Sequence, residues 1–189
     1  MSKYVLVLNE KWFKDLLEDY EAAFNELSRK LGYFNEDLAK EGVFIKSTTV
    51  NYLGNEYPFP IAVPLRQLYN WMTGVAGCPE EVEKILENIL QLVWFNPFVD
   101  NTELLDVSWE QWTGATGSYI GIFYRFAQIS LKLERNEEIN ATDLAMISGL
   151  SAAAIGKQLR AGKIKGSKTA AGWSIEAMEA KGWLIKRVN

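Results

Sequence analysis

The pattern of helix caps and glycines in about the last fifty residues constrains the fold more than any other feature of the chain. Asn140 or Thr142 can cap a short helix, and Gly149 can adopt the left-handed conformation that ends it. Ser151 can then cap a second helix over residues 152–161. Two short helices joined by a tight turn that contains glycine form a helix-turn-helix layout.

The second of these helices has an apolar inner face and a polar outer face. Ile155 and Leu159 stand four residues apart and therefore share the inner face. The outer face offers Lys157, Gln158 and Arg160, and Gly162 ends the helix.

The residues after this helix have the pattern of a β-hairpin. We expect a short strand over residues 163–165, a polar turn over 166–172 and a returning strand over 173–175. A last helix is expected over residues 176–182, ended by Gly182. Trp173, Trp183 and Leu184 are expected to pack in the core.

This arrangement resembles the winged helix-turn-helix domains of the excisionase and MerR type, over about the last quarter of the chain. The residues that carry the resemblance are Thr142 to Ala145, Ile147 to Ser151, Ile155, Leu159, Arg160 to Ile164, Trp173 to Ile175, Trp183 and Leu184. The chain departs from the family at Ala153 and Ala154, where a bulky or basic residue is frequent, and at Glu176, where proline is frequent. The resemblance implies binding to double-stranded DNA.

The residues expected to meet DNA come from the second helix and the hairpin. Gln158 could pair with adenine and Arg160 with guanine, or either could hold a phosphate. Lysines along the hairpin would meet phosphates, and small residues of the helix would permit close approach. The predicted DNA-binding residues are Ser151, Ala153, Ala154, Lys157, Gln158, Arg160, Lys163, Lys165 and Lys168.

The preceding 138 residues resemble no family that we can name, and their pattern is mainly helical. The expected elements are a buried strand over residues 4–8, helices over 10–30, 64–75, 79–94 and 119–133, and β-like segments between 42 and 63 with a turn at Gly54 and Asn55. The fold class is therefore mainly α with some β structure (α+β). Residues 135–138 suggest a boundary between a mostly helical domain, 1–135, and the winged helix-turn-helix domain, 136–189.

The composition excludes several kinds of chemistry. The chain has no histidine and one cysteine, Cys78, so no imidazole base, internal disulfide or thiolate metal cluster is available. No phosphate-binding glycine loop is present, and we expect no cofactor, metal site or catalytic residue. No leader or membrane-spanning run is recognisable, which favours a soluble, cytoplasmic protein.

The charge is divided unevenly along the chain. Residues 139–189 carry eight Lys/Arg and three Asp/Glu, whereas residues 1–138 carry 12 and 21. A basic end on an acidic body suits a protein in which one module meets phosphate.

The leading hypothesis is a DNA-binding protein without enzymatic activity, either a transcriptional regulator or an accessory factor of a phage or mobile element. The acidic N-terminal domain would form a homodimer or bind a partner protein. One alternative is a metal-dependent nuclease that uses the module as its DNA anchor. Another is a phage or plasmid adaptor or inhibitor that binds a protein.

Overall fold

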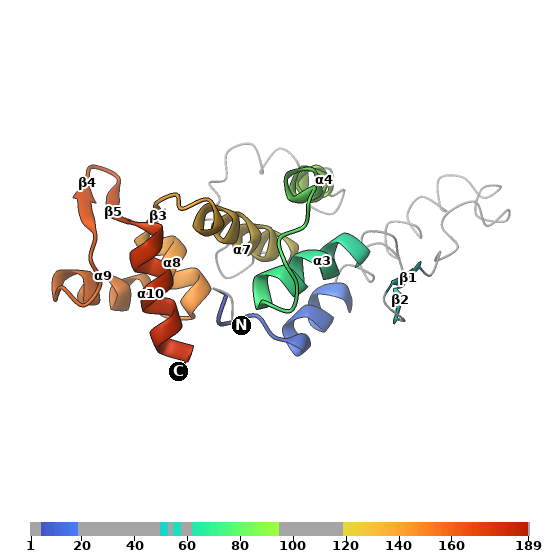
Figure 1. Cartoon of the computed structure of the whole chain (residues 1–189), viewed down its shortest axis with the longest axis horizontal. Helices are drawn as coiled ribbons and strands as arrows, with labels where there is room; N and C mark the ends of the chain where they lie inside the picture. Colours follow the sequence, from blue (N-terminus) through green and yellow to red (C-terminus); the bar gives the residue numbers. More distant parts are fainter. Residues whose placement is uncertain (1–4, 19–49, 53–54, 58–61, 95–118, 189) are drawn as a thin grey trace, which may run out of the picture. The chain divides into compact units, whose positions relative to one another are not determined.

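The computed structural model describes residues 5–18, 50–52, 55–57, 62–94 and 119–188 (Figure 1). In these residues the fold is mainly helical with a small antiparallel sheet, so the expected α+β class is confirmed. The helices are residues 10–18, α3 (Ala62–Thr73), α4 (Val82–Trp94), α7 (Tyr119–Glu134), α8 (Ala141–Ser148), α9 (Ala152–Arg160) and α10 (Ala177–Val188). The strands are β1 (Val50–Tyr52), β2 (Asn55–Tyr57), β3 (Ile139–Asn140), β4 (Ser167–Thr169) and β5 (Gly172–Ile175).

The chain divides into two compact units. One, here called the C-terminal unit, combines residues 1–9, 69–79 and 123–189. The other, the N-terminal unit, combines residues 10–68 and 80–122. The separation into independent domains 1–135 and 136–189 stays a prediction, since a compact unit need not be an independently folding domain.

In the N-terminal unit, helix 10–18 is held by contacts with α3. Phe13 and Leu16 are fully buried, as are Leu65 and Leu68 of α3. The Arg66 guanidinium lies 4.3 Å from the centre of the Phe13 ring and forms an ion pair of 2.7 Å with Glu10. The predicted helix over 10–30 is therefore confirmed as far as residue 18, and the rest of it lies outside the described residues.

The β-like segment of the N-terminal unit forms a short hairpin. β1 and β2 pair antiparallel, with Val50 opposite Tyr57. The expected second strand does not continue to Val63, because α3 already begins at Ala62. Pro64 is the third residue of α3, where proline is tolerated because the first-turn N–H groups have no acceptor within the helix. Phe44, Thr48, Thr49 and the turn at Gly54 lie outside the described residues.

The two longer helical predictions between 79 and 133 are confirmed. α4 begins at Val82, just after the predicted start, with Glu83 near the positive end of its dipole. α7 buries most of its side chains, including Phe123, Phe126, Ile129 and Leu133. It ends in a Schellman motif: the Asn136 N–H donates to Leu133 O, the Glu137 N–H to Lys132 O, and Asn136 has a φ of 57°.

The expected strand over residues 4–8 is wrong. Residues 6–7 form a turn, and Tyr4 lies outside the described residues. The Leu6 N–H donates to Ile147 O at the end of α8, at 2.8 Å, and Val5 and Leu8 are buried. The apolar residues are thus buried without pairing in a β-sheet. A short apolar run in the sequence shows that a segment is buried, but not whether it forms a strand.

The expected strand over residues 163–165 is also wrong, and so is the seven-residue turn after it. The first hairpin strand is β4, at Ser167–Thr169. Ile164 is buried, and a Cβ on Gly166 would lie 2.7 Å from Ser174 O and 2.9 Å from Leu159 Cδ2. The backbone therefore passes so close to β5 and α9 at Gly166 that pairing begins only beyond it.

A third strand completes the sheet, in the order β3-β5-β4. Ile139 of β3 pairs with Ile175 of β5, and Lys168 of β4 pairs with Trp173. The sequence reading missed β3, which is too short to show alternation.

The last helix is longer than expected. α10 runs through Gly182, the predicted end, and continues to Val188. Ala177, Ala180 and Leu184 are buried on one face at spacings of three and four residues. The buried face continues past the glycine, so packing outweighs the low helix propensity of glycine.

Candidate nucleic-acid interface

The junction between α8 and α9 is defined by its caps. Asn140, rather than Thr142, caps α8: its side chain accepts from the Asp143 N–H at 2.7 Å, and Asp143 reaches back to the Asn140 N–H. Gly149 ends α8 with a φ of 72°, and the Ser151 hydroxyl caps α9 by accepting from the Ala154 N–H at 3.2 Å. The predicted two helices and their tight turn are present.

The inner face of α9 is also as expected. Ile155 and Leu159 are buried, and so are Leu144 and Ile147 of α8. Gly162 ends α9 with a φ of 67°, and the Lys163 N–H donates to Gln158 O at 2.9 Å. Burial of one face fixes which side of α9 points outward.

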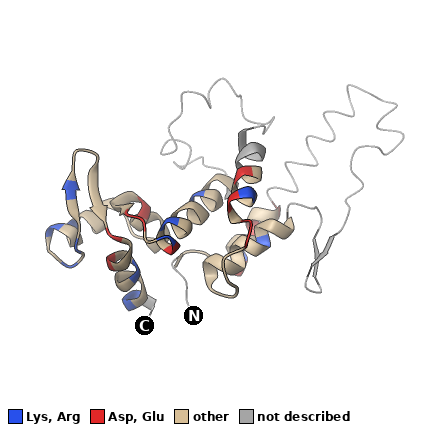
Figure 2. Cartoon of the chain, turned by 45° about the horizontal axis from the view of Figure 1, so that its top comes forward, with Lys and Arg blue, Asp and Glu red and all other residues tan. Residues whose placement is uncertain are grey.

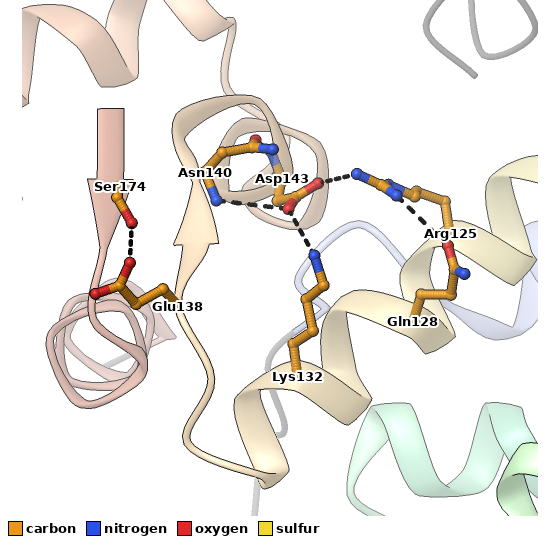
Figure 3. A network of polar contacts seen from close by, with 7 residues as sticks. All are labelled: Arg125, Gln128, Lys132, Glu138, Asn140, Asp143 and Ser174. Atoms are coloured by element: carbon orange, nitrogen blue, oxygen red, sulfur yellow. Dashed lines mark hydrogen bonds and ion pairs between the residues drawn. The ribbon is translucent and has the colours of Figure 1, made fainter. Parts of the chain in front are cut away.

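An ion-pair network ties α8 to α7 (Figure 3). Arg125 Nη2 of α7 lies 2.6 Å from Asp143 Oδ1, and Lys132 Nζ lies 4.0 Å from Asp143 Oδ2. Glu138, just before β3, accepts a hydrogen bond from the Ser174 hydroxyl of β5. Asp143 therefore both caps α8 and anchors it to α7.

The outer face of α9 carries a line of three exposed residues. Ala153, Lys157 and Arg160 are all exposed, and spacings of four and three residues place them on one side of the helix. A Cβ on Gly156 would lie 3.5 Å from Arg160 Nη1, so the guanidinium folds back along the helix toward its middle. Ser151 is exposed and Ala154 is half-buried.

Three further lysines follow α9. Lys163 and Lys165 lie between α9 and β4, and Lys168 lies on β4; all three are exposed. The Lys165 N–H donates to Glu179 Oε1 of α10 at 3.0 Å, which ties this connecting segment to α10.

The five cations named above share an acid-free stretch. Between Asp143 and Glu176 the sequence holds five Lys/Arg and no Asp or Glu. Figure 2 shows blue without red along α9, the segment after it and β4. Within the described part of the chain, no carboxylate lies within ion-pair distance of the side-chain nitrogens of these five residues, although the Glu179 carboxylate accepts from the Lys165 backbone N–H. We call this set, Lys157, Arg160, Lys163, Lys165 and Lys168, the basic strip.

Gln158 differs from its neighbours on α9. Its side chain is half-buried, and its Oε1 accepts a hydrogen bond from Trp183 Nε1 of α10 at 3.0 Å. Trp183 and Trp173 are half-buried rather than fully buried in the core as expected, whereas Leu184 is buried.

The other sequence features carry no site in the described residues. Glu179 accepts from the Lys165 backbone, and Lys181 Nζ donates to Asn136 Oδ1 at 2.8 Å, so both have structural partners. Trp109 and Trp112 lie outside the described residues. Where side chains are described, no group of three or more Cys, Asp or Glu could hold a metal ion.

The sequence reading missed two polar groups around the helices. Asp143, three residues after the Asn140 cap, is the capping-box signal that could have been recognised. Its pairing with Arg125, 18 residues earlier, has no local signal. Arg187 stacks over Trp183 at 5.1 Å from the ring centre, an i, i+4 pairing that could have been recognised on a helix predicted to extend further.

Comparison of the chain with models of protein families, with curated proteins and with solved structures yields no match. Among the described helices, none combines the length and the apolar character that crossing a membrane requires.

Proposed function

We propose that the protein binds double-stranded DNA, with α8 and α9 as a helix-turn-helix, α9 as the recognition helix and the β4–β5 hairpin as the wing. The observation that carries this proposal is the basic strip: five exposed cations without a carboxylate in ion-pair distance among the described residues. Unpaired cations on one helix and the segment after it are what a phosphate backbone attracts.

The dimensions of α9 support the same use. It has nine residues, which corresponds to a length of about 14 Å. The Ser151 cap and Ala153 place small side chains at its start, before the larger Lys157 and Arg160. A helix of this length and profile can enter a major groove, whose width is about 12 Å.

The role that fits is a transcriptional regulator or an accessory factor of a phage or mobile element. One module of this size covers a short half-site, so we expect two copies of the chain to bind adjacent half-sites. Dimerisation would be the task of the acidic N-terminal part, whose charge disfavours DNA contact.

The proposal is tested by neutralising single members of the basic strip in the full-length chain. Arg160→Ala and Lys163→Ala should each weaken binding to mixed duplex DNA by roughly tenfold, because each removes one charge-assisted contact. Both side chains are exposed, so thermal unfolding should not change. Lys84→Ala is the matched control: Lys84 is exposed, lies on α4 and is 3.3 Å from Glu81. Wild-type affinity in both strip variants would contradict the proposal.

A further inference from the structure

We propose that Gln158, Trp183 and Arg187 form a second contact with the DNA backbone, in which Trp183 holds the Gln158 amide as a hydrogen-bond donor to phosphate. This inference rests on the proposed function and extends the contact surface from α9 onto α10. We call these three residues the Trp183 cluster.

Trp183 sets the orientation of the Gln158 amide. Trp183 Nε1 of α10 lies 3.0 Å from Gln158 Oε1 of α9. An indole N–H can only donate a hydrogen bond, so the amide must present its oxygen to Trp183. The Gln158 NH₂ group then points away from the indole nitrogen.

This orientation leaves the Gln158 NH₂ group available to a ligand. In the described part of the chain, the Gln158 NH₂ group has no hydrogen-bond acceptor. A bidentate contact with adenine would require the amide oxygen to accept a second hydrogen bond beside the one from Trp183, whereas a phosphate contact needs the NH₂ group alone. Phosphate oxygens only accept, so they match the remaining two N–H groups.

A cation, Arg187, lies over the ring of Trp183. The Arg187 guanidinium lies over the Trp183 ring, 5.1 Å from its centre, and Arg187 is exposed. The N–H at the edge of the Trp183 ring thus holds the Gln158 amide, whose NH₂ group is a neutral donor. The face of the same ring supports the positive charge of Arg187. A neutral donor next to a guanidinium is a combination that favours an anion without reading a base.

The first test uses Gln158→Glu and Arg187→Gln in the full-length chain. A glutamate can still accept from Trp183 Nε1, but it replaces the donor with a negative charge that repels phosphate. We expect Gln158→Glu to weaken binding at least about tenfold. Arg187→Gln should lower the slope of log affinity against log salt by about 0.9, the loss of one phosphate contact. Lys181→Gln is the control, since it removes a charge from another face of α10.

The second test separates phosphate contact from base reading. Binding of each variant to a pool of random duplexes is followed by sequencing of the bound fraction. A contact with phosphate predicts uniform weakening with the sequence preference unchanged. A changed preference in Gln158→Glu, or wild-type affinity and slope in both variants, would overturn the inference. Because Arg187 is exposed, Arg187→Gln remains informative even where Gln158→Glu unfolds.

The third test concerns Trp183 as a positioning residue. Trp183→Phe removes the indole N–H and keeps an aromatic ring for Arg187. Trp183→Phe and Gln158→Leu should each weaken binding about threefold, and the double variant should be no weaker than either, because both remove the same contact. Additive losses would show that Trp183 does not act through Gln158.

Wild-type protein that binds no duplex would refute the proposed function itself, whereas wild-type binding with unaffected variants would refute only this inference.

Discussion

Arg125 of α7 and Asp143 of α8 form an ion pair of 2.6 Å in which the carboxylate is buried and the guanidinium is partly open to solvent. The side chain of Asp143 is 1% exposed and that of Arg125 is 25% exposed. The same carboxylate also caps α8 through the Asn140 N–H. One side chain therefore fixes both the start of α8 and its attachment to α7, upstream of the basic strip.

Removing either partner of this pair should destabilise the fold, and unequally. Among the described residues, Arg125→Ala leaves the buried carboxylate with one cation, Lys132 at 4.0 Å, and with the Asn140 N–H, and should cost about 3–5 kcal/mol. Asp143→Ala leaves a guanidinium that water can reach, and should cost about 2–3 kcal/mol including the lost cap. Urea unfolding of the two variants measures both. The double variant should lose less than the sum, and strictly additive losses would show that the residues do not interact.

Two glycines of the C-terminal unit should respond to alanine in opposite directions. A Cβ on Gly166 would lie 2.7 Å from Ser174 O, a backbone atom, so Gly166→Ala should cost about 1–3 kcal/mol. A Cβ on Gly182 would meet nothing within 4 Å, and Gly182 lies inside α10, so Gly182→Ala should stabilise by about 0.5–1 kcal/mol. The unfolding temperatures of the two variants and of the wild type measure both effects. Destabilisation by Gly182→Ala would show that α10 does not continue through this residue.

Tyr124 makes the stability of the C-terminal unit sensitive to alkaline pH. Burial raises the pKa of its phenol above the ordinary value of 10.0, although the hydrogen bond with Gln128 opposes this. The unfolded chain loses the proton near pH 10 while the folded chain still holds it. The stabilisation that the Tyr124 phenol contributes to the folded state is therefore complete below pH 10 and is lost as the pH rises through the folded pKa.

A Tyr124→Phe variant tests this relationship. Its unfolding free energy should fall less steeply than that of the wild type between about pH 9.5 and 11, since phenylalanine does not titrate. The two proteins differ at this one side chain, so only the difference in slope matters. Parallel curves would show that the Tyr124 phenol ionises as easily in the folded chain as in the unfolded one.

The sequence predicted the elements whose signals are local. Gly149, Ser151 and Gly162 identified the ends of α8 and α9, because caps act within one helical turn. The buried pair Ile155 and Leu159 predicted which side of α9 points outward, and hence the exposure of Lys157 and Arg160.

Non-local contacts account for what the sequence did not predict. Gly166 approaches Ser174 and Leu159 so closely that β4 begins four residues later than the alternation of Lys163, Ile164 and Lys165 suggested. Gln158 looked like a free outward side chain, but its partner Trp183 is 25 residues away. Neither contact can be predicted from the residues that neighbour it in the sequence.

The central claim is tested most directly by the affinity of the full-length chain for mixed duplex DNA between 50 and 200 mM salt. If all five cations of the basic strip meet phosphates, the affinity should fall about 500-fold over this range. Replacing the five with glutamine should abolish most of that fall while the unfolding temperature stays near that of the wild type, because all five are exposed. A wild-type affinity that does not depend on salt, or no binding at micromolar protein, would contradict the account.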